Sequence, residues 1–156
     1  MASRKEKYPD TRTFKFYNAN PKGRMTCDCV VRAICTAMDR PYNDVLKEMF
    51  EVSIETGYEY TDKKCIEKYL ESKGWTKYKQ PRKGDNTKYT GKEFCDWIQE
   101  DINHDEFCGY DMSYLKRIIA NIGGNHIVAI VNGKVNDIWD STGGCIGNYW
   151  VKGNKK

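Results

Sequence analysis

The stretch NHIVAIVNGKVNDIWD, residues 125–140, constrains the fold of this chain more than any other. It contains two apolar runs separated by Asn132–Gly133, and Asn-Gly between such runs is the strongest short-range signal for a β-hairpin. A type I′ turn at this pair places Val131 opposite Lys134. The sequence therefore predicts two antiparallel strands joined by a tight turn.

Helical patterns precede this hairpin. From Asp28 onward, apolar residues recur at helical spacing, and Asp28 itself is well suited to be the N-cap. Further helices are predicted at 41–57, at 61–74 with Thr61 as the cap, at 90–101 and at 111–121, and further short strands at 13–20 and 147–151. Because helices come first and an antiparallel sheet comes last, the pattern predicts the α+β class rather than alternating α/β.

The chain of 156 residues has the size of one domain. We expect a single domain over 1–156, with flexible basic tails at 1–12 and 152–156. There is no apolar run of roughly eighteen residues to predict a membrane span, and the charged N-terminus lacks the apolar stretch of a secretory signal. These features favour a cytoplasmic location, where cysteines remain thiols. Seven cysteines, an odd number, exclude a complete set of internal disulfides.

The net charge of +4 is concentrated at the two ends of the chain. Residues 1–25 carry seven basic and two acidic side chains, and residues 141–156 carry three lysines and no acid. Basic ends of this kind can contact nucleic acid or an acidic partner. However, the chain lacks a compact run of lysine and arginine, and its tyrosines are not spaced as a stacking platform. We therefore expect a solubilising surface, with neither nucleic acid nor a membrane as partner.

The segment TCDCVVRAIC, residues 26–35, holds three of the cysteines. If Asp28 caps the helix, Cys29 is the first helical residue, and the positive end of the helix dipole stabilises a thiolate there. This position lowers the pKa of a thiol below its free value of about 8.5. Cys27 lies outside the helix and gains less. Cys29 is therefore the candidate nucleophile, and a buried inert cysteine is the alternative interpretation.

The chain has only two histidines, and their surroundings differ. His104 lies in a polar, acidic stretch and is predicted to be solvated, whereas His126 opens the first strand of the hairpin. Continuing the hairpin register puts His126 opposite Trp139, with Asp137 on the same face of the sheet. The carboxylate of Asp137 is then a diagonal neighbour that can orient the imidazole. Together with Cys29, these residues supply the nucleophile, the base and the orienting acid of thiol chemistry.

The order of these elements resembles that of papain-like cysteine peptidases, with a cysteine on a buried helix, a histidine at the start of a strand, and Asp or Asn on the next strand. NDIWD is similar to the Asn-Ser-Trp element of that superfamily, in which a Trp covers the third catalytic residue. More closely, NANPKGRMTCDCVVRAICTA and NHIVAIVNGKVNDIWDSTGGCIGNYW resemble small papain-like proteins of phages and Gram-positive bacteria without assigned substrates. The resemblance covers both ends of the chain and little of its middle. It implies a papain-like fold, with the nucleophile helix packed on a C-terminal antiparallel sheet, Asp137 as the orienting residue and Trp139 as its cover.

Two positions of the expected site have alternatives. Papain-like enzymes place a Gln six residues before the nucleophile as an oxyanion-hole donor, and this chain has Gly23 there. Asn20 or Asn18 is the candidate replacement, together with the backbone N–H of the nucleophile. Asp140 is a second candidate for the orienting residue, but strict alternation turns it to the opposite face of the sheet, so Asp137 is favoured.

A zinc site is the main structural alternative for the cysteines. Cys27, Cys29 and Cys35 supply suitable ligands, and HDEFC adds His104 and Cys108. The chain lacks a second C-x-x-C pair, however, and the spacing is not that of a standard zinc site. The catalytic interpretation is therefore favoured over the metal site.

The residues and the resemblance together predict a cysteine hydrolase that needs neither cofactor nor metal. It would act on a peptide, isopeptide or side-chain amide bond through a thioester acyl-enzyme, with a protein or peptide as substrate. The alternative comes from a different class: a catalytically inactive papain-like interaction protein that binds a host or regulatory partner through its basic ends. The sequence specifies neither the substrate nor the oligomeric state.

Overall fold

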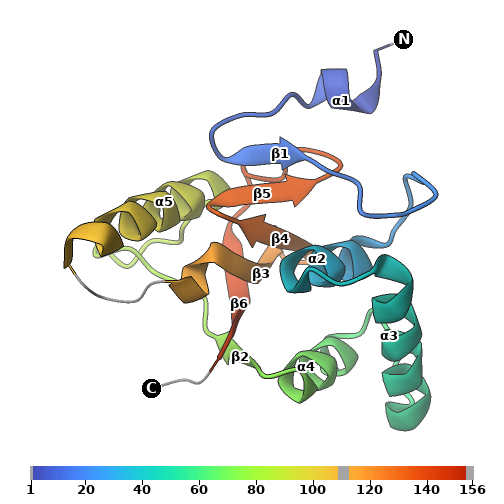
Figure 1. The fold of residues 1–156 in the computed structure, drawn as a ribbon. Helices are drawn as coiled ribbons and strands as arrows, with labels where there is room; N and C mark the ends of the chain where they lie inside the picture. Colours follow the sequence, from blue (N-terminus) through green and yellow to red (C-terminus); the bar gives the residue numbers. More distant parts are fainter. Residues whose placement is uncertain (1, 109–112, 154–156) are drawn as a thin grey trace.

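A six-stranded mixed sheet forms the centre of the structure, a computed structural model that describes the backbone of residues 2–108 and 113–153 and the side chains of 2–102 and 113–153 (Figure 1). The strand order is β1-β5-β4-β3-β6-β2. The strands are β1 (Phe14–Phe16), β2 (Trp75–Tyr78), β3 (Arg117–Ile122), β4 (His126–Val131), β5 (Lys134–Asp137) and β6 (Ile146–Lys152). β1 runs parallel to β5, and the other neighbouring pairs are antiparallel.

The hairpin formed by β4 and β5 has the predicted register. Val131 pairs with Lys134. Asn132 and Gly133 have φ values of 51° and 74°, which are the positive values that a type I′ turn requires. The register fixes which side chains of the two strands share a face, and so positions His126 relative to the strand that follows.

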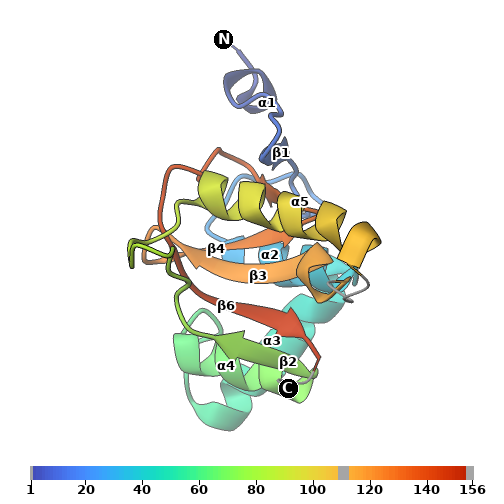
Figure 2. The same ribbon diagram turned by 90° about the vertical axis from the view of Figure 1, so that its left-hand side faces the viewer.

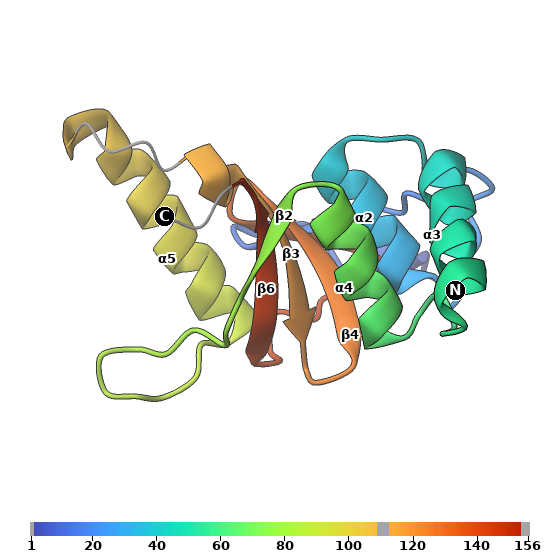
Figure 3. The ribbon, with the colours of Figure 1, turned by 90° about the horizontal axis from the view of Figure 1, so that it is seen from below.

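Four of the five strand pairings in the described sheet are antiparallel, so the fold is of the predicted α+β class, and helices cover both faces of the sheet. α2 (Cys29–Met38), α3 (Tyr42–Thr56) and α4 (Lys63–Ser72) lie on one face, and α5 (Gly91–Cys108) lies on the other (Figures 2 and 3). A short α1 (Arg4–Lys7) precedes β1, and a 3-10 turn, η1 (Ser113–Lys116), leads into β3. None of the described helices is long and apolar enough to cross a membrane.

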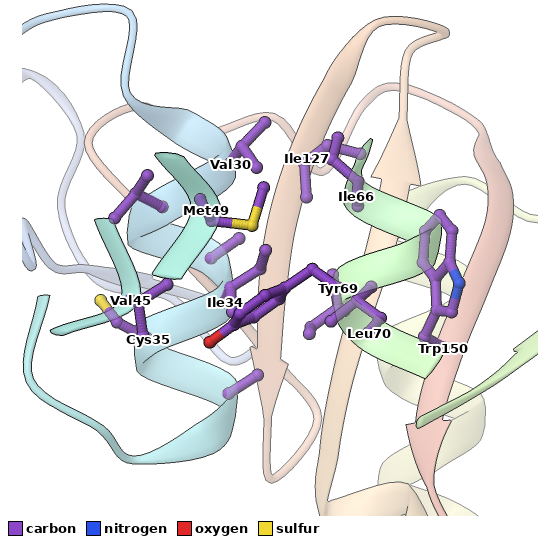
Figure 4. Close-up of a cluster of buried hydrophobic side chains, with 14 of the residues drawn as sticks. Val30, Ile34, Cys35, Val45, Met49, Ile66, Tyr69, Leu70, Ile127 and Trp150 are labelled. Atoms are coloured by element: carbon purple, nitrogen blue, oxygen red, sulfur yellow. The ribbon is translucent and has the colours of Figure 1, made fainter. Parts of the chain in front are cut away.

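Two clusters of buried side chains hold these layers together, one on each face of the sheet. The first joins α2, α3 and α4 to the sheet and includes Ile34, Met49 and Tyr69 (Figure 4). The second packs Phe94 and Ile98 of α5 against the opposite face. Because successive strand residues point to opposite faces, the central strands contribute side chains to both clusters. The helix α2, which begins at Cys29, is therefore held against the sheet by the first cluster.

The prediction of a helix at 111–121 is wrong. Residues 117–122 form β3, the strand between β4 and β6, and only 113–116 form a helical turn, while 111 and 112 lie outside the described residues. Ile118, Ile119, Ala120 and Ile122 are all buried because both faces of β3 are covered. A strand covered on both faces has a continuous apolar run instead of the alternation that identifies a half-exposed strand. The strand β2, which begins directly after Gly74, was not predicted from the sequence.

Several predicted boundaries also differ from the structure. The N-cap of α4 is Asp62 instead of Thr61, and its carboxylate accepts a hydrogen bond from the backbone N–H of Lys64 at 2.8 Å. α5 continues to residue 108 rather than 101. Part of the expected N-terminal tail forms α1, and the Arg4 side chain donates a hydrogen bond to the carbonyl of Ile138 at 2.7 Å. The expected C-terminal tail begins one residue too early, because residue 152 is the last residue of β6. Residues 154–156 lie outside the described residues.

We expect Gly91→Ala to lower the free energy of unfolding by about 1–3 kcal/mol because the start of α5 has no room for a methyl group. A Cβ atom at this position would lie 2.6 Å from Cδ1 of Ile122 and 2.9 Å from the Cα of Thr142. Gly84→Ala is the matched control, since nothing lies within 4 Å of its Cβ position. Urea unfolding of both variants tests this, and equal midpoints would contradict the close packing between α5 and the loop around Thr142.

Candidate active site

Cys29 is the first residue of α2, and its side chain is half-buried where this helix end meets β4. The N–H groups of a first helical turn have no carbonyl partner within the helix, and together with the dipole they favour a negative charge. Among the described residues, the His126 side chain and the backbone of Ile127 lie close enough to the thiol of Cys29 to stabilise its thiolate. The cysteine and histidine that the sequence singled out are therefore neighbours.

His126 and Asp137 form a direct hydrogen bond. The Nε2 atom of His126 lies 2.5 Å from Oδ2 of Asp137, and Asp137 is 1% exposed. Since Nε2 faces the carboxylate, Nδ1 is the nitrogen left for the thiol of Cys29. The Trp139 ring lies beside the imidazole, with 5.1 Å between ring centroids. The imidazole therefore contacts the carboxylate through one nitrogen and lies near the thiol with the other.

Asp28 occupies the N-cap position of α2, but its carboxylate makes no capping hydrogen bond. Instead, Oδ1 accepts from Nε of Arg32 at 2.8 Å, and Oδ2 accepts from the Tyr42 hydroxyl at 2.7 Å and from the Asn20 amide at 3.0 Å. The predicted N-cap position of Asp28 is therefore confirmed, but its side chain does not bond to the helix N-terminus. The carboxylate turns inward because a buried guanidinium one helical turn away competes for it more strongly than a backbone N–H does.

Arg32 connects the helix to the carboxylate that holds the histidine. Its Nη1 donates a hydrogen bond to Oδ1 of Asp137 at 2.8 Å, and its Nε donates one to Oδ1 of Asp28. The arginine is 5% exposed. Oδ1 of Asp137 also accepts from the backbone N–H of Ile138 at 2.7 Å. Both oxygens of Asp137 are thus occupied, one by the histidine and the other by Arg32 and the backbone. This arrangement fixes the carboxylate in position and in its ionised form.

The electrostatics of the site favour an ion pair between thiolate and imidazolium. Burial raises the pKa of Cys29, but hydrogen bonds from His126 and Ile127 and the charges of His126 and Arg32 outweigh burial, so its pKa lies below the ordinary range. Burial lowers the pKa of His126, but the hydrogen bond to Asp137 and the contact with Cys29 outweigh it and raise the pKa to about 9. The charged forms of both groups are therefore stabilised together.

The remaining predicted site residues lie around this centre with other contacts. Asp140 accepts hydrogen bonds from the backbone N–H and the hydroxyl of Thr142, at 3.0 and 2.6 Å, and so orders the loop after β5. The carboxylate bonded to the His126 imidazole is that of Asp137. Asn20 donates to Asp28, as described above. The amide of Asn18 donates to the carbonyl of Arg24 at 3.1 Å, a bond within the loop between β1 and α2.

The other cysteines have separate environments. Cys27 and Cys145 are exposed, and Cys35 is buried, with its thiol donating to the carbonyl of Arg32 at 3.4 Å. Burial raises the pKa of Cys35 to about 11. Within the part of the chain whose side chains are described, no group of three His, Cys, Asp or Glu residues is arranged to hold a metal ion. The side chains of His104 and Cys108, proposed as zinc ligands from the sequence, lie outside that part.

Sequence reasoning missed Arg32 and Tyr42 as members of the site. Asp28 and Arg32 are four residues apart, a spacing that places an acid and a base on the same side of a helix. This spacing was an available signal, but it normally indicates a solvent-exposed pair. An arginine in the middle of the apolar pattern of α2 was the stronger hint, because a charged residue at a buried helical position requires a partner.

Comparison with known protein families, curated proteins and solved structures finds no match for this chain.

Proposed function

We propose that this protein is a cysteine hydrolase or acyltransferase with a papain-like site, in which Cys29, His126 and Asp137 act as nucleophile, acid–base and orienting residue. The observation that carries the proposal is the continuous set of contacts from the helix-initial thiol through the imidazole to a buried, doubly held carboxylate. A histidine that serves only packing does not need an ionised partner fixed by a buried arginine. The same geometry is what a thiol nucleophile requires.

The chemistry follows from the charge states. The Cys29 thiolate attacks an acyl carbon, a C–S bond forms, and the carbonyl electrons move to its oxygen. The His126 imidazolium gives its proton to the leaving nitrogen, the C–N bond breaks, and a thioester remains. Water, deprotonated by the now neutral imidazole, then attacks the thioester and releases the acid, while the thiolate and imidazolium are restored.

The backbone N–H of Cys29, at the start of α2, would stabilise the developing oxyanion by a hydrogen bond. Asn20 is the proposed side-chain donor. Its amide has two N–H groups, and since one donates to Asp28, the other is left for the oxyanion. The bond to Asp28 holds this amide in place, which a preorganised donor needs. No Gln occupies the corresponding place in this chain, and residue 23 is a glycine with a φ of 64°.

The substrate would be a peptide, isopeptide or side-chain amide that reaches the thiol between two hollows. One, of about 260 Å³, is lined in part by Ile127 and Trp150, and Ile127 contacts the Cys29 thiol through its backbone. The other, of about 230 Å³, is lined by Trp139 and the glycines of neighbouring loops, and Trp139 contacts His126. Free cysteines at the described positions suit a reducing compartment such as the cytoplasm.

The test is iodoacetamide alkylation as a function of pH, with each cysteine scored by peptide mass spectrometry. At pH 6 we expect Cys29 to react about tenfold or more faster than the exposed Cys145, because only a thiolate is a competent nucleophile. His126→Ala should remove most of this lead, since the imidazolium partner is lost. A Cys29 that reacts no faster than Cys145 at any pH would refute an activated thiol.

Acylation by nitrophenyl acetate separates catalysis from a merely reactive thiol. We expect an acetyl group on Cys29 in the wild type that is subsequently hydrolysed, no such adduct in Cys29→Ala, and an unchanged reaction in the matched variant Cys145→Ala. An adduct that forms on Cys29 but is never hydrolysed would instead support the alternative of an inactive interaction protein.

A further inference from the structure

We propose a second ligand site, for a small organic anion with an apolar body, at the end of α2 opposite Cys29. A hollow of about 450 Å³ lies there, lined chiefly by Met38, Arg40, Lys73, Trp75, Arg117 and Lys152. These residues come from the last turn of α2 and the loop that follows it, the C-cap of α4, the first residue of β2, the start of β3 and the end of β6. Figure 3 shows these element ends converging on one side of the molecule.

Four cationic side chains surround this hollow, and they are only partly neutralised. Arg40 forms a two-point contact with Glu48, at 2.5 and 2.9 Å, and Lys73 approaches the same carboxylate at 3.3 Å. The guanidinium of Arg40 lowers the pKa of Glu48 to about 2, so this acid remains charged. One carboxylate thus offsets one of the four positive charges. Among the ion pairs of the described residues, none involves Arg117 or Lys152, which leaves a net positive hollow.

The Arg117 guanidinium uses only one of its nitrogen atoms in hydrogen bonds to the described residues. Its Nη1 atom donates to the carbonyls of Thr36 and Ala37, at 2.9 and 3.4 Å, at the C-terminal end of α2. These bonds hold the guanidinium in place and leave its other N–H groups without an acceptor among the described residues. A guanidinium fixed by one edge can present the other to a carboxylate, sulfonate or phosphate in a two-point contact.

The floor of the hollow is apolar. Ala37 and Met38 contribute one wall, and the indole of Trp75, which is 4% exposed, contributes another. The volume lies within the range of small-molecule sites, roughly 300–1,000 Å³, which combine apolar walls with a few placed polar groups. An apolar floor below a cationic rim is complementary to a ligand with a ring or chain and at least one anionic group. A purely polar anion such as inorganic phosphate would leave the floor unused.

This site is separate from the proposed catalytic centre. Arg117 and His126 lie at opposite ends of the paired strands β3 and β4, because Arg117 pairs with Val131 and Ile122 pairs with His126. Five residue steps along β3 correspond to roughly 17 Å at 3.3–3.4 Å per residue. The hollow also shares no lining residue with the hollow that contains Ile127 or with the hollow that contains Trp139. A ligand here therefore does not occupy the position of the substrate.

The test uses anilinonaphthalene sulfonate, which combines an aromatic body with one anionic group and becomes fluorescent in apolar surroundings. We expect saturable binding of one molecule to the folded protein and weaker binding of the uncharged analogue phenylnaphthylamine. Lys152→Glu should weaken the affinity for the sulfonate by about fivefold to thirtyfold, since an attraction is replaced by a repulsion. Its matched control is Lys92→Glu, an exposed lysine outside the hollow with the same change of net charge.

Near-UV circular dichroism of each variant shows that the comparison is made on folded protein. Equal affinity of Lys152→Glu and Lys92→Glu for the sulfonate, equal affinity of the two ligands, or no saturable binding by the wild type would each overturn the proposal. Arg117→Gln provides an independent variant that should also weaken binding. None of these readouts involves thiol reactivity, so the result is independent of the proposed hydrolase activity.

Discussion

Arg32→Met is expected to lower the free energy of unfolding by about 3–5 kcal/mol, because it leaves two buried carboxylates without their shared cation. Asp28 and Asp137 are 6% and 1% exposed, and each accepts a hydrogen bond of 2.8 Å from the guanidinium. A methionine fills a similar volume but replaces neither the charge nor the two donors. Chemical denaturation at pH 7 measures the loss, which is a large fraction of the stability of a typical domain.

The destabilisation should depend on pH in a defined direction. The pKa values of Asp28 and Asp137 are lowered in the folded protein, burial notwithstanding, so both carboxylates contribute stability above their ordinary pKa and lose it as the pH falls through the lowered values. In the variant this contribution is reduced, and the difference from the wild type should shrink below about pH 4. Arg82→Met, at an exposed arginine, is the matched control and should change stability by less than about 0.5 kcal/mol. A pH-independent loss would indicate that Arg32 acts through packing alone.

Asp137→Asn is expected to slow alkylation of Cys29 at pH 6 by about tenfold or more, and to move the rise of its pH profile to higher pH. An amide cannot supply the negative charge that, against the effect of burial, raises the pKa of His126 to about 9. The imidazole is then largely neutral at pH 7, and the thiolate loses its cationic partner. Alkylation rates of Cys29 between pH 5 and pH 9 (about the range that iodoacetamide permits) measure both effects.

Asp140→Asn makes the same chemical change three residues later and provides the comparison. Asp140 contacts Thr142 and not the imidazole, so its replacement should leave the pH profile of Cys29 where it is. If the two variants shift the profile equally, Asp137 is not the residue that orients His126. If only Asp140→Asn shifts it, the roles of the two carboxylates are reversed.

The placement of His126 near Asp137 was accessible from the sequence because it depends on local rules. The Asn-Gly turn determines the register of the hairpin, and register determines which side chains share a face. The helix that begins at Cys29 follows from its apolar spacing and a polar residue before it. Local patterns do not predict that this helix packs on that sheet, and that expectation came from the resemblance to papain-like proteins inferred from the sequence.

Features that depend on distant pairing were not accessible in this way. β3 was read as a helix because its residues are buried on both faces, and only the positions of α2 and α5 on either side explain that pattern. The role of Arg32 depends on Asp137, which lies 105 residues later in the chain. Likewise, the Asp28 carboxylate makes no capping hydrogen bond, because it is bound by partners on α2, on α3 and in the preceding loop.

The parallel pairing of β1 with β5 has a consequence for the newly made chain. Phe16 pairs with Asp137, and the backbone N–H of Tyr17 donates to the Asp137 carbonyl at 2.9 Å, so β5 is supported by a segment that is synthesised more than a hundred residues before it. A nascent polypeptide that has reached only residue 125 contains Cys29 but neither of its partners. Under the proposed function, the thiol would be activated only after β4 and β5, which carry His126 and Asp137, have been synthesised.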